Sequence, residues 1–191
     1  MASAPLRIVG ISGSLRRGSF NTALLKAAAE LAPAGVTIEV HTIHGIPLYD
    51  ADVESAGIPE AVMKLKDAIA TSDGLLLVTP EYNNSLPGVF KNAIDWLSRP
   101  DADIARVFRH RPVAITGASP GRFGTTISQV AWLPVLRTLG MRAWFDEKLL
   151  VFEAKRLFDA SGALTDEHTK ERLAKFVAGF ATFVREQAPG G

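Results

Sequence analysis

The chain has 191 residues, of which 47% are hydrophobic and 21% charged, and its formal net charge is +1. This composition is typical of a globular protein, and the length predicts a single domain over residues 1–191 with a full hydrophobic core. The balanced charge gives no electrostatic reason to expect nucleic acid or an anionic membrane as a partner.

Three features that the sequence lacks limit the functions that we expect of the protein. Without cysteine the chain has no disulfide, no thiolate nucleophile and no Cys-bound metal, so redox chemistry would need a bound cofactor. The four histidines have no spacing typical of zinc sites, and no metal site is expected. The N-terminal apolar run is short, and no run approaches the ~20 apolar residues that span a bilayer. The sequence therefore predicts a cytoplasmic enzyme without membrane contact.

The first predicted strand, residues 6–12, leads into a loop of glycines, hydroxyl side chains and two arginines within residues 10–22. The loop lacks the lysine of GxxxxGKS/T, and its glycines do not fit GxGxxG. Its hydroxyls and Arg16, followed by a helix from Ala23, suit a terminal phosphate at a helix N-terminus. The same residues also fit an ordinary loop in which Ser19 or Asn21 caps the helix.

The next two predicted strands differ in pattern. Residues 36–42 alternate between apolar and polar side chains, which is typical of a strand near the edge of a sheet. Residues 74–79 are apolar almost throughout, as expected of a strand with helices on both faces. Between them, a helix is predicted to begin at Pro59.

A polar shelf follows the third predicted strand. Pro80 and Pro87 restrict the backbone on either side of a polar segment that contains one aromatic ring, Tyr82. A planar heterocycle with carbonyl and N–H edges would be satisfied by such a segment. The alternative is a Pro-bounded entry into a helix, with Tyr82 packed on its own loop.

The helix after Pro87 is apolar on several sides, more than contact with one sheet requires, and this excess predicts a subunit interface. Its apolar residues are Val89, Phe90, Ala93, Ile94, Trp96 and Leu97.

The chain after residue 111 completes an alternation of strands and helices. A fourth strand over residues 112–118 precedes a second Gly-rich loop, whose glycines permit close approach of backbone to a flat ligand. Pro134 is expected to kink or interrupt the following helix, which runs from about Thr125 to Leu139. A fifth strand is predicted over residues 142–151, and a last helix with Thr165 as its N-cap.

This alternation predicts an α/β fold with a doubly wound parallel sheet. In such sheets ligands bind beyond the carboxyl ends of the strands, where the strand order reverses. We therefore expect the loops after strands one, three and four to meet around a mononucleotide with a large flat head group.

Four segments together resemble the NADPH-dependent FMN reductase family, close to the bacterial chromate and quinone reductases: GSLRRGSFNT, PLYDAD, TPEYNNSLPGVFKNAIDWLSRP and GASPGRFGTT. The resemblance implies a three-layer, flavodoxin-like, five-stranded sheet of order 2-1-3-4-5 and a homodimer or homotetramer. It also implies non-covalently bound FMN with NADPH or NADH as electron donor. Such an enzyme would transfer two electrons through FMN to quinones, chromate, azo compounds or free flavin, its substrates binding in alternation.

The resemblance also implies which residues form the site. The FMN phosphate would be held by Ser14, Arg16, Ser19, Asn21 and Thr22. The isoalloxazine ring would be lined by Pro80, Glu81, Tyr82 and Asn83, with Ser119 and Gly121 at its other end. No side chain is assigned as a catalytic acid or base, because the cofactor carries the chemistry. Close relatives often have Tyr where this chain has Asn84, which leaves open any contact that uses that ring.

Two other functions remain compatible with these residues. A flavodoxin-type electron carrier would share the fold and the phosphate loop, although such carriers usually present an acidic docking face that the balanced charge does not suggest. A non-catalytic nucleotide-binding module would bind its ligand without turnover.

Overall fold

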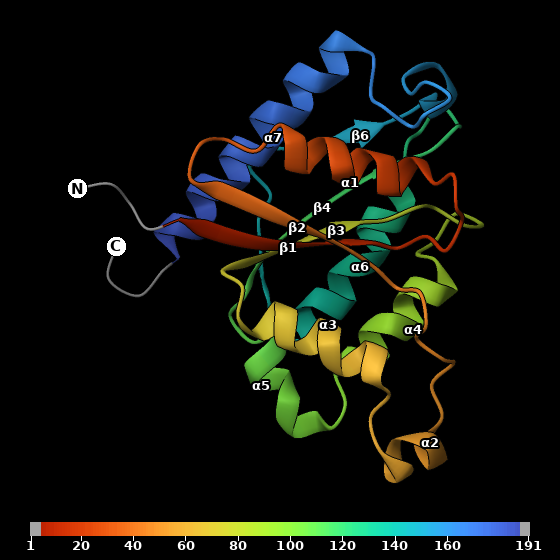
Figure 1. Ribbon diagram of the computed structural model, residues 1–191, viewed down its shortest axis with the longest axis vertical. Helices are drawn as coiled ribbons and strands as arrows, with labels where there is room; N and C mark the ends of the chain where they lie inside the picture. Colours follow the sequence, from red (N-terminus) through yellow and green to blue (C-terminus); the bar gives the residue numbers. More distant parts are fainter. Residues whose placement is uncertain (1–4, 188–191) are drawn as a thin grey trace.

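The computed structural model describes residues 5–187 and contains a parallel sheet of order β2-β1-β3-β4-β5, as the resemblance implies (Figure 1). A sixth short strand, β6, also pairs with β4 in parallel. The alternating strand β2 lies at the edge, and the apolar strands β1, β3 and β4 are internal. The strands are β1 (Leu6–Ser12), β2 (Val36–Thr42), β3 (Gly74–Val78), β4 (Pro112–Ala118), β5 (Arg142–Ala143) and β6 (Leu150–Val151).

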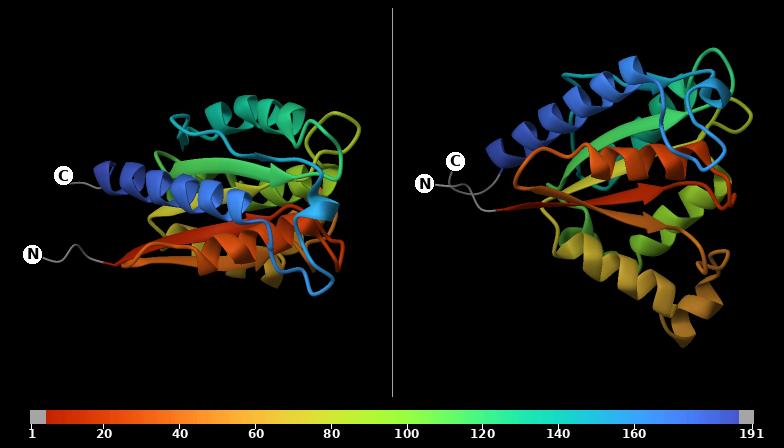
Figure 2. Two further views of the ribbon diagram at one scale, coloured as in Figure 1. Left: turned by 90° about the horizontal axis from the view of Figure 1, so that it is seen from above. Right: turned by 45° about the horizontal axis from the view of Figure 1, so that its top comes forward.

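Helices cover both faces of this sheet and make the three layers. Figure 2 shows α1 and α7 together on one side and α3 on the other. Successive strand residues point to opposite faces, so Ile8 belongs to the core under α1 and α7, whereas Val9 belongs to the core under the other helices. The longer helices are α1 (Phe20–Glu30), α3 (Glu60–Ala70), α4 (Gly88–Leu97), α6 (Thr126–Thr138) and α7 (Glu167–Glu186).

Four short helical segments were not predicted. The segments are α2 (Ala51–Ala56), α5 (Ile104–Val107) and the 3-10 turns η1 (Asp101–Asp103) and η2 (Ala154–Arg156). The helix α2 buries no residue, so it has no apolar stripe that the sequence could reveal.

The prediction of a single fifth strand over residues 142–151 is wrong. Its two ends pair with β4 as β5 and β6, and the segment between them leaves the sheet. Trp144 packs on the α7 side, with its ring centroid 5.1 Å from that of Phe176. The charged residues Asp146, Glu147 and Lys148 follow, and they could not lie unpaired within a buried strand.

One helix interior and two helix boundaries also differ from the predictions. Pro134 does not interrupt α6, because it lies on the exposed side of the helix. Proline cannot donate a hydrogen bond to the carbonyl one turn earlier, and on this side that carbonyl can bond to water instead. Pro59 is the N-cap of α3 rather than its first residue. Asp166, not Thr165, caps α7, since its carboxylate accepts a hydrogen bond from the Thr169 amide, while the Thr165 hydroxyl donates to the Leu157 carbonyl.

The apolar excess of α4 is explained within the chain. Its large apolar side chains, including Phe90 and Trp96, are buried against the sheet and neighbouring helices. The Trp96 indole also donates to the Pro47 carbonyl and packs edge-on against Tyr49. The sequence argument for a subunit interface on α4 therefore loses its basis, although the oligomeric state itself stays a prediction.

Within residues 5–187, no helix is long and apolar enough to cross a membrane.

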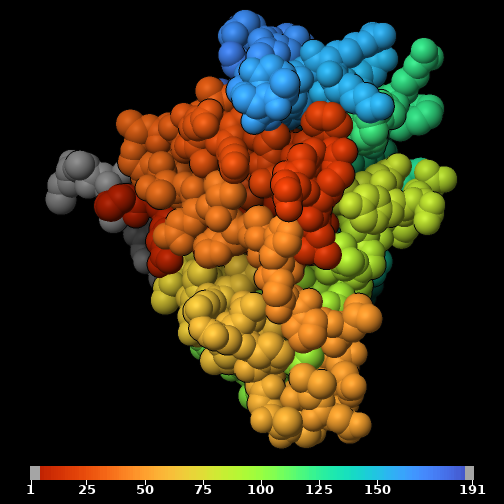
Figure 3. Space-filling model, turned by 45° about the vertical axis from the view of Figure 1, so that its right-hand side comes forward, coloured from red at the N-terminus to blue at the C-terminus, as the bar shows by residue number. Residues whose placement is uncertain are grey.

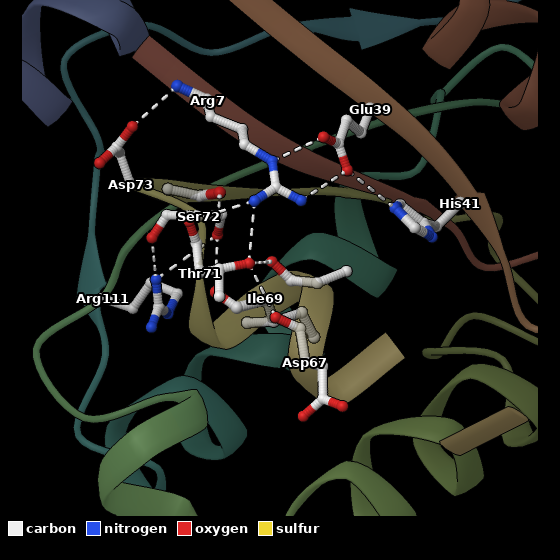
Figure 4. Close-up of polar contacts among 11 residues, drawn as sticks. Arg7, Glu39, His41, Asp67, Ile69, Thr71, Ser72, Asp73 and Arg111 are labelled. Carbon is white, nitrogen blue, oxygen red and sulfur yellow. Dashed lines mark hydrogen bonds and ion pairs between the residues drawn. The ribbon is translucent and has the colours of Figure 1, made fainter. Parts of the chain in front are cut away.

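A polar network joins β1, β2 and the start of β3 (Figure 4). The Arg7 guanidinium donates to both carboxylate oxygens of Glu39, at 2.6 and 3.1 Å, and also to the Thr71 hydroxyl. Glu39 therefore joins the edge strand β2 to β1 through Arg7. The hydrogen bonds from Arg7 lower the pKa of Glu39.

This lowered pKa makes part of the stability depend on pH. The ionised Glu39 stabilises the folded protein above its unfolded-state pKa, and that contribution is lost as the pH falls through the lower folded-state pKa. We expect Glu39→Gln to be less stable than wild type at pH 7 in urea unfolding, and the difference to shrink as the pH is lowered below about 4. A difference that stays constant from pH 7 to pH 3 would contradict this account.

Candidate functional site

The loops that follow β1, β3 and β4 lie on the same side of the molecule, at the carboxyl edge of the sheet. In Figure 3 they are the red-orange, yellow-green and green surfaces (residues 13–19, 79–87 and 119–125). The chain runs from β1 to β2 in one direction and from β3 to β4 in the other, so the strand order reverses between β1 and β3. This is where ligands bind in open α/β sheets.

The β1 loop (residues 13–19) is anchored at both ends. The Gly13 amide donates to the Val78 carbonyl at 2.9 Å, which joins the loop to β3. At the other end Ser19 is the N-cap of α1, and its hydroxyl accepts from the amides of Asn21 and Thr22. Of the two capping residues that the ordinary-loop alternative allowed, Ser19 and Asn21, the structure has Ser19 as the N-cap.

Between these anchors the β1 loop offers unused donors. The amides of Leu15, Arg17 and Gly18 donate to no acceptor among residues 5–187. Ser14 is buried, and the Thr22 hydroxyl lies 2.8 Å from that of Ser12. The loop itself contains no acidic residue. Free N–H groups beside a helix N-terminus form a binding site for an anion.

Arg16 is an exposed residue of this loop. Its guanidinium carbon lies 5.1 Å from the centroid of the Phe20 ring, and its backbone amide donates to the Ser14 hydroxyl at 3.3 Å. Stacking on Phe20 keeps the positive charge near the loop without neutralising it.

Asn21 has a structural task that the sequence did not predict. Its buried amide donates to the Ala118 carbonyl at 2.9 Å and accepts from the Ala118 amide at 2.8 Å. This pair of bonds ties the start of α1 to the end of β4. The Asn21 side chain therefore holds the start of α1 in place and has no amide group left over for a ligand oxygen at these two positions.

The shelf (residues 80–85) contains a tight turn. The amides and carbonyls of Tyr82 and Ser85 bond to each other, and the two residues between them, Asn83 and Asn84, have φ angles of 50° and 56°. Two successive left-handed residues are typical of a type I′ turn, in which asparagine is favoured. The turn gives a physical reason for Asn84, and it leaves the Tyr82 side chain exposed.

The Glu81 carboxylate points away from the turn, toward α6. It accepts hydrogen bonds from the amides of Ile127 and Ser128, at 2.8 and 3.0 Å. Neither residue of α6 was predicted to support the site, because no local pattern relates them to a glutamate more than 40 positions earlier.

The β4 loop (residues 119–125) is fixed by its neighbours. Ser119 donates its amide to Val151 of β6, and its hydroxyl accepts from the Gly121 amide at 3.0 Å. Just before the loop, a Cβ at Gly117 would overlap the Thr79 carbonyl, so the backbones after β3 and β4 touch. The structure therefore brings the predicted residues of all three loops to one edge.

A sequence model of the NADPH-dependent FMN reductase family matches residues 6–154. The chain is 42% identical over 183 residues to an NAD(P)H-dependent FMN reductase of Pseudomonas aeruginosa, covering 96% of this chain and 97% of the relative. It is 40% identical to a 2-hydroxy-1,4-benzoquinone reductase of a Burkholderia species, with coverage of 95% and 98%.

Among solved structures, the chain is similar to the flavoenzyme NAD(P)H:(acceptor) oxidoreductase FerB of Paracoccus denitrificans. The TM-score is 0.83 and the identity 34%, over 95% of this chain and 98% of the other. The match of the family model over most of the chain, together with these identities, gives a single assignment. The protein belongs to the NADPH-dependent FMN reductase family.

Proposed function

We propose that the protein is an FMN-dependent NAD(P)H oxidoreductase whose preferred acceptors are quinones. The observation that carries the proposal is the β1 loop, which has free amides, hydroxyls and Arg16 together at the switch between β1 and β3. When bound there, FMN would supply two-electron chemistry between a nicotinamide donor and a flat acceptor.

The residues fit a phosphate dianion on chemical grounds. Amides and hydroxyls of residues 14–19, with Thr22, provide donors to its three terminal oxygens, and Arg16 provides charge. The shelf and the β4 loop would line the ring, mainly through backbone groups of Pro80 to Asn83, Ser119 and Gly121. No side chain is needed as an acid or base, and Glu81 is occupied by the helix amides.

The surroundings of the site favour a flat apolar acceptor. Each of the three loops carries a large exposed apolar side chain, namely Leu15, Tyr82 and Phe123, the last of them 80% exposed. Such side chains would cover the faces of a quinone but would gain little from chromate, which is a hydrated anion. Relatives named quinone reductases, including one from Escherichia coli at 36% identity, support the same preference. Chromate, azo compounds and free flavin are proposed as secondary acceptors that bind in alternation with the donor.

The test begins with the visible spectrum of the purified protein, or of the protein after addition of FMN. We expect tight FMN binding, followed by rapid oxidation of NADPH or NADH in a single turnover and faster steady-state reduction of benzoquinones than of chromate. Binding of FMN without oxidation of the nicotinamide would indicate an electron carrier. No affinity for FMN would indicate a different nucleotide-binding module.

We expect Arg16→Ala to weaken FMN binding by about tenfold to a hundredfold, because a charge-assisted contact with the phosphate is lost. The measurement is the dissociation constant from quenching of FMN fluorescence. Arg122→Ala is the matched control, since it removes an exposed arginine from the β4 loop at the same edge. Equal losses in the two variants would mean that Arg16 contributes only general charge.

We also propose that the protein forms a homodimer or homotetramer. The support is an apolar stripe on the exposed side of α6, formed by Ile127, Val130 and Leu133. Sedimentation velocity measures the oligomeric state directly.

A further inference from the structure

We propose that Glu81 is a positioning residue for FMN, because its carboxylate attaches the shelf to the N-terminus of α6. The inference rests on the function proposed above, in which the shelf lines the flavin ring.

The first observation is that Glu81 caps α6 from a distant part of the chain. The N-cap residue of α6, Thr125, does not cap the helix with its side chain, because its hydroxyl accepts from the Gln129 side chain and from no backbone amide of the helix. The Glu81 carboxylate accepts instead from the amides of Ile127 and Ser128. A carboxylate is favoured at a helix N-terminus by the free amides and by the helix dipole, and its hydrogen bonds are stronger than those of a neutral acceptor.

The second observation is a set of buried hydrogen bonds just before Glu81. The Ser128 hydroxyl lies 2.9 Å from the Thr79 hydroxyl and donates to the Pro80 carbonyl at 2.9 Å. The Trp132 indole donates to the Thr79 hydroxyl at 3.0 Å. These groups are shielded from water, so the end of β3 has one favourable position against α6.

The third observation is that the attachment ends at Glu81. Within residues 5–187, the hydrogen bonds of residues 82–85 run only between Tyr82 and Ser85, inside the turn. The shelf therefore has internal order but no hydrogen bond to the rest of the protein beyond Glu81. Without the Glu81 carboxylate, the turn would keep its shape and lose its fixed orientation to the β1 and β4 loops.

The experiment compares Glu81→Ala with Glu81→Gln. Alanine removes both the charge and the acceptor, whereas glutamine removes the charge but keeps an oxygen that can accept from the two amides. The matched controls are Glu39→Ala and Glu39→Gln. Glu39 also accepts two hydrogen bonds from one partner, Arg7, through its carboxylate, and it lies in β2, outside the three loops of the site.

Two quantities are measured. Hydrogen exchange of the Ile127 and Ser128 amides, in the protein without FMN, reports the cap itself. The FMN dissociation constant reports the position of the shelf. We expect Glu81→Ala to lose amide protection and to bind FMN about tenfold more weakly, Glu81→Gln to stay within about threefold of wild type, and the Glu39 variants to bind as wild type.

Unchanged FMN binding in Glu81→Ala, or equal weakening in Glu39→Ala, would overturn the inference. If wild type itself binds no FMN, the proposed function fails, which is a different result. Should Glu81→Ala not fold, Ser128→Ala removes the hydroxyl contacts of the same attachment from the helix side. We expect it to weaken FMN binding by several-fold, and wild-type affinity in that variant would count against the proposal.

Discussion

Gly13→Ala is expected to abolish tight FMN binding and to destabilise the protein by about 3 kcal/mol. A Cβ at this position would overlap the Phe90 ring, with the ring Cγ only 2.6 Å away. Phe90 has no room to move, because it is fully buried and packs edge-on against Trp132 at 4.9 Å between centroids. The β1 loop must therefore shift, which breaks the Gly13–Val78 hydrogen bond and moves the free amides.

The matched control is Gly18→Ala in the same loop. A Cβ at Gly18 would meet nothing within 4 Å, and this glycine has no left-handed backbone angle that alanine would resist. Urea unfolding of the FMN-free proteins and titration with FMN measure the two effects. Similar results for the two variants would show that the contact with Phe90 does not determine the position of the loop.

The second large effect is expected from Asn21→Ala, which leaves the buried amide and carbonyl of Ala118 without partners. Each unsatisfied buried group costs roughly 1–3 kcal/mol, so we expect a loss of about 3 kcal/mol in the free energy of unfolding. FMN binding should weaken by at least about tenfold, because the start of α1 is no longer tied to β4.

Asn92→Ala provides a matched control for this variant. Asn92 also lies in a helix and also makes two hydrogen bonds to a backbone, accepting from Tyr49 and donating to Pro47, both at 2.8 Å. These backbone groups are exposed, and water can replace the lost amide. We expect a loss of no more than about 1 kcal/mol and unchanged FMN binding. A larger loss in Asn92→Ala than in Asn21→Ala would contradict the role of burial.

Much of the fold was predictable because its causes are local. Apolar runs gave the internal strands, and the alternation in residues 36–42 identified the edge strand β2. The predictions that were wrong concern segments in which tertiary contacts outweigh the local sequence pattern. Residues 142–151 have the apolar content of a strand, but Trp144 packs against α7 and the following charged residues leave the sheet. Likewise, whether Pro134 interrupts a helix depended on which side of α6 meets solvent.

The sequence by itself determined which hydrogen-bond donors the β1 loop offers, because residue types and their order after a strand decide this chemistry. Only the tertiary structure decided which residues of the three loops hold the loops in position. Asn21 binds Ala118, Glu81 caps α6 and Gly13 makes room for Phe90. The physical reason is that these contacts join residues roughly 45 to 100 positions apart, and their energies depend on burial and on distances of a few tenths of an ångström.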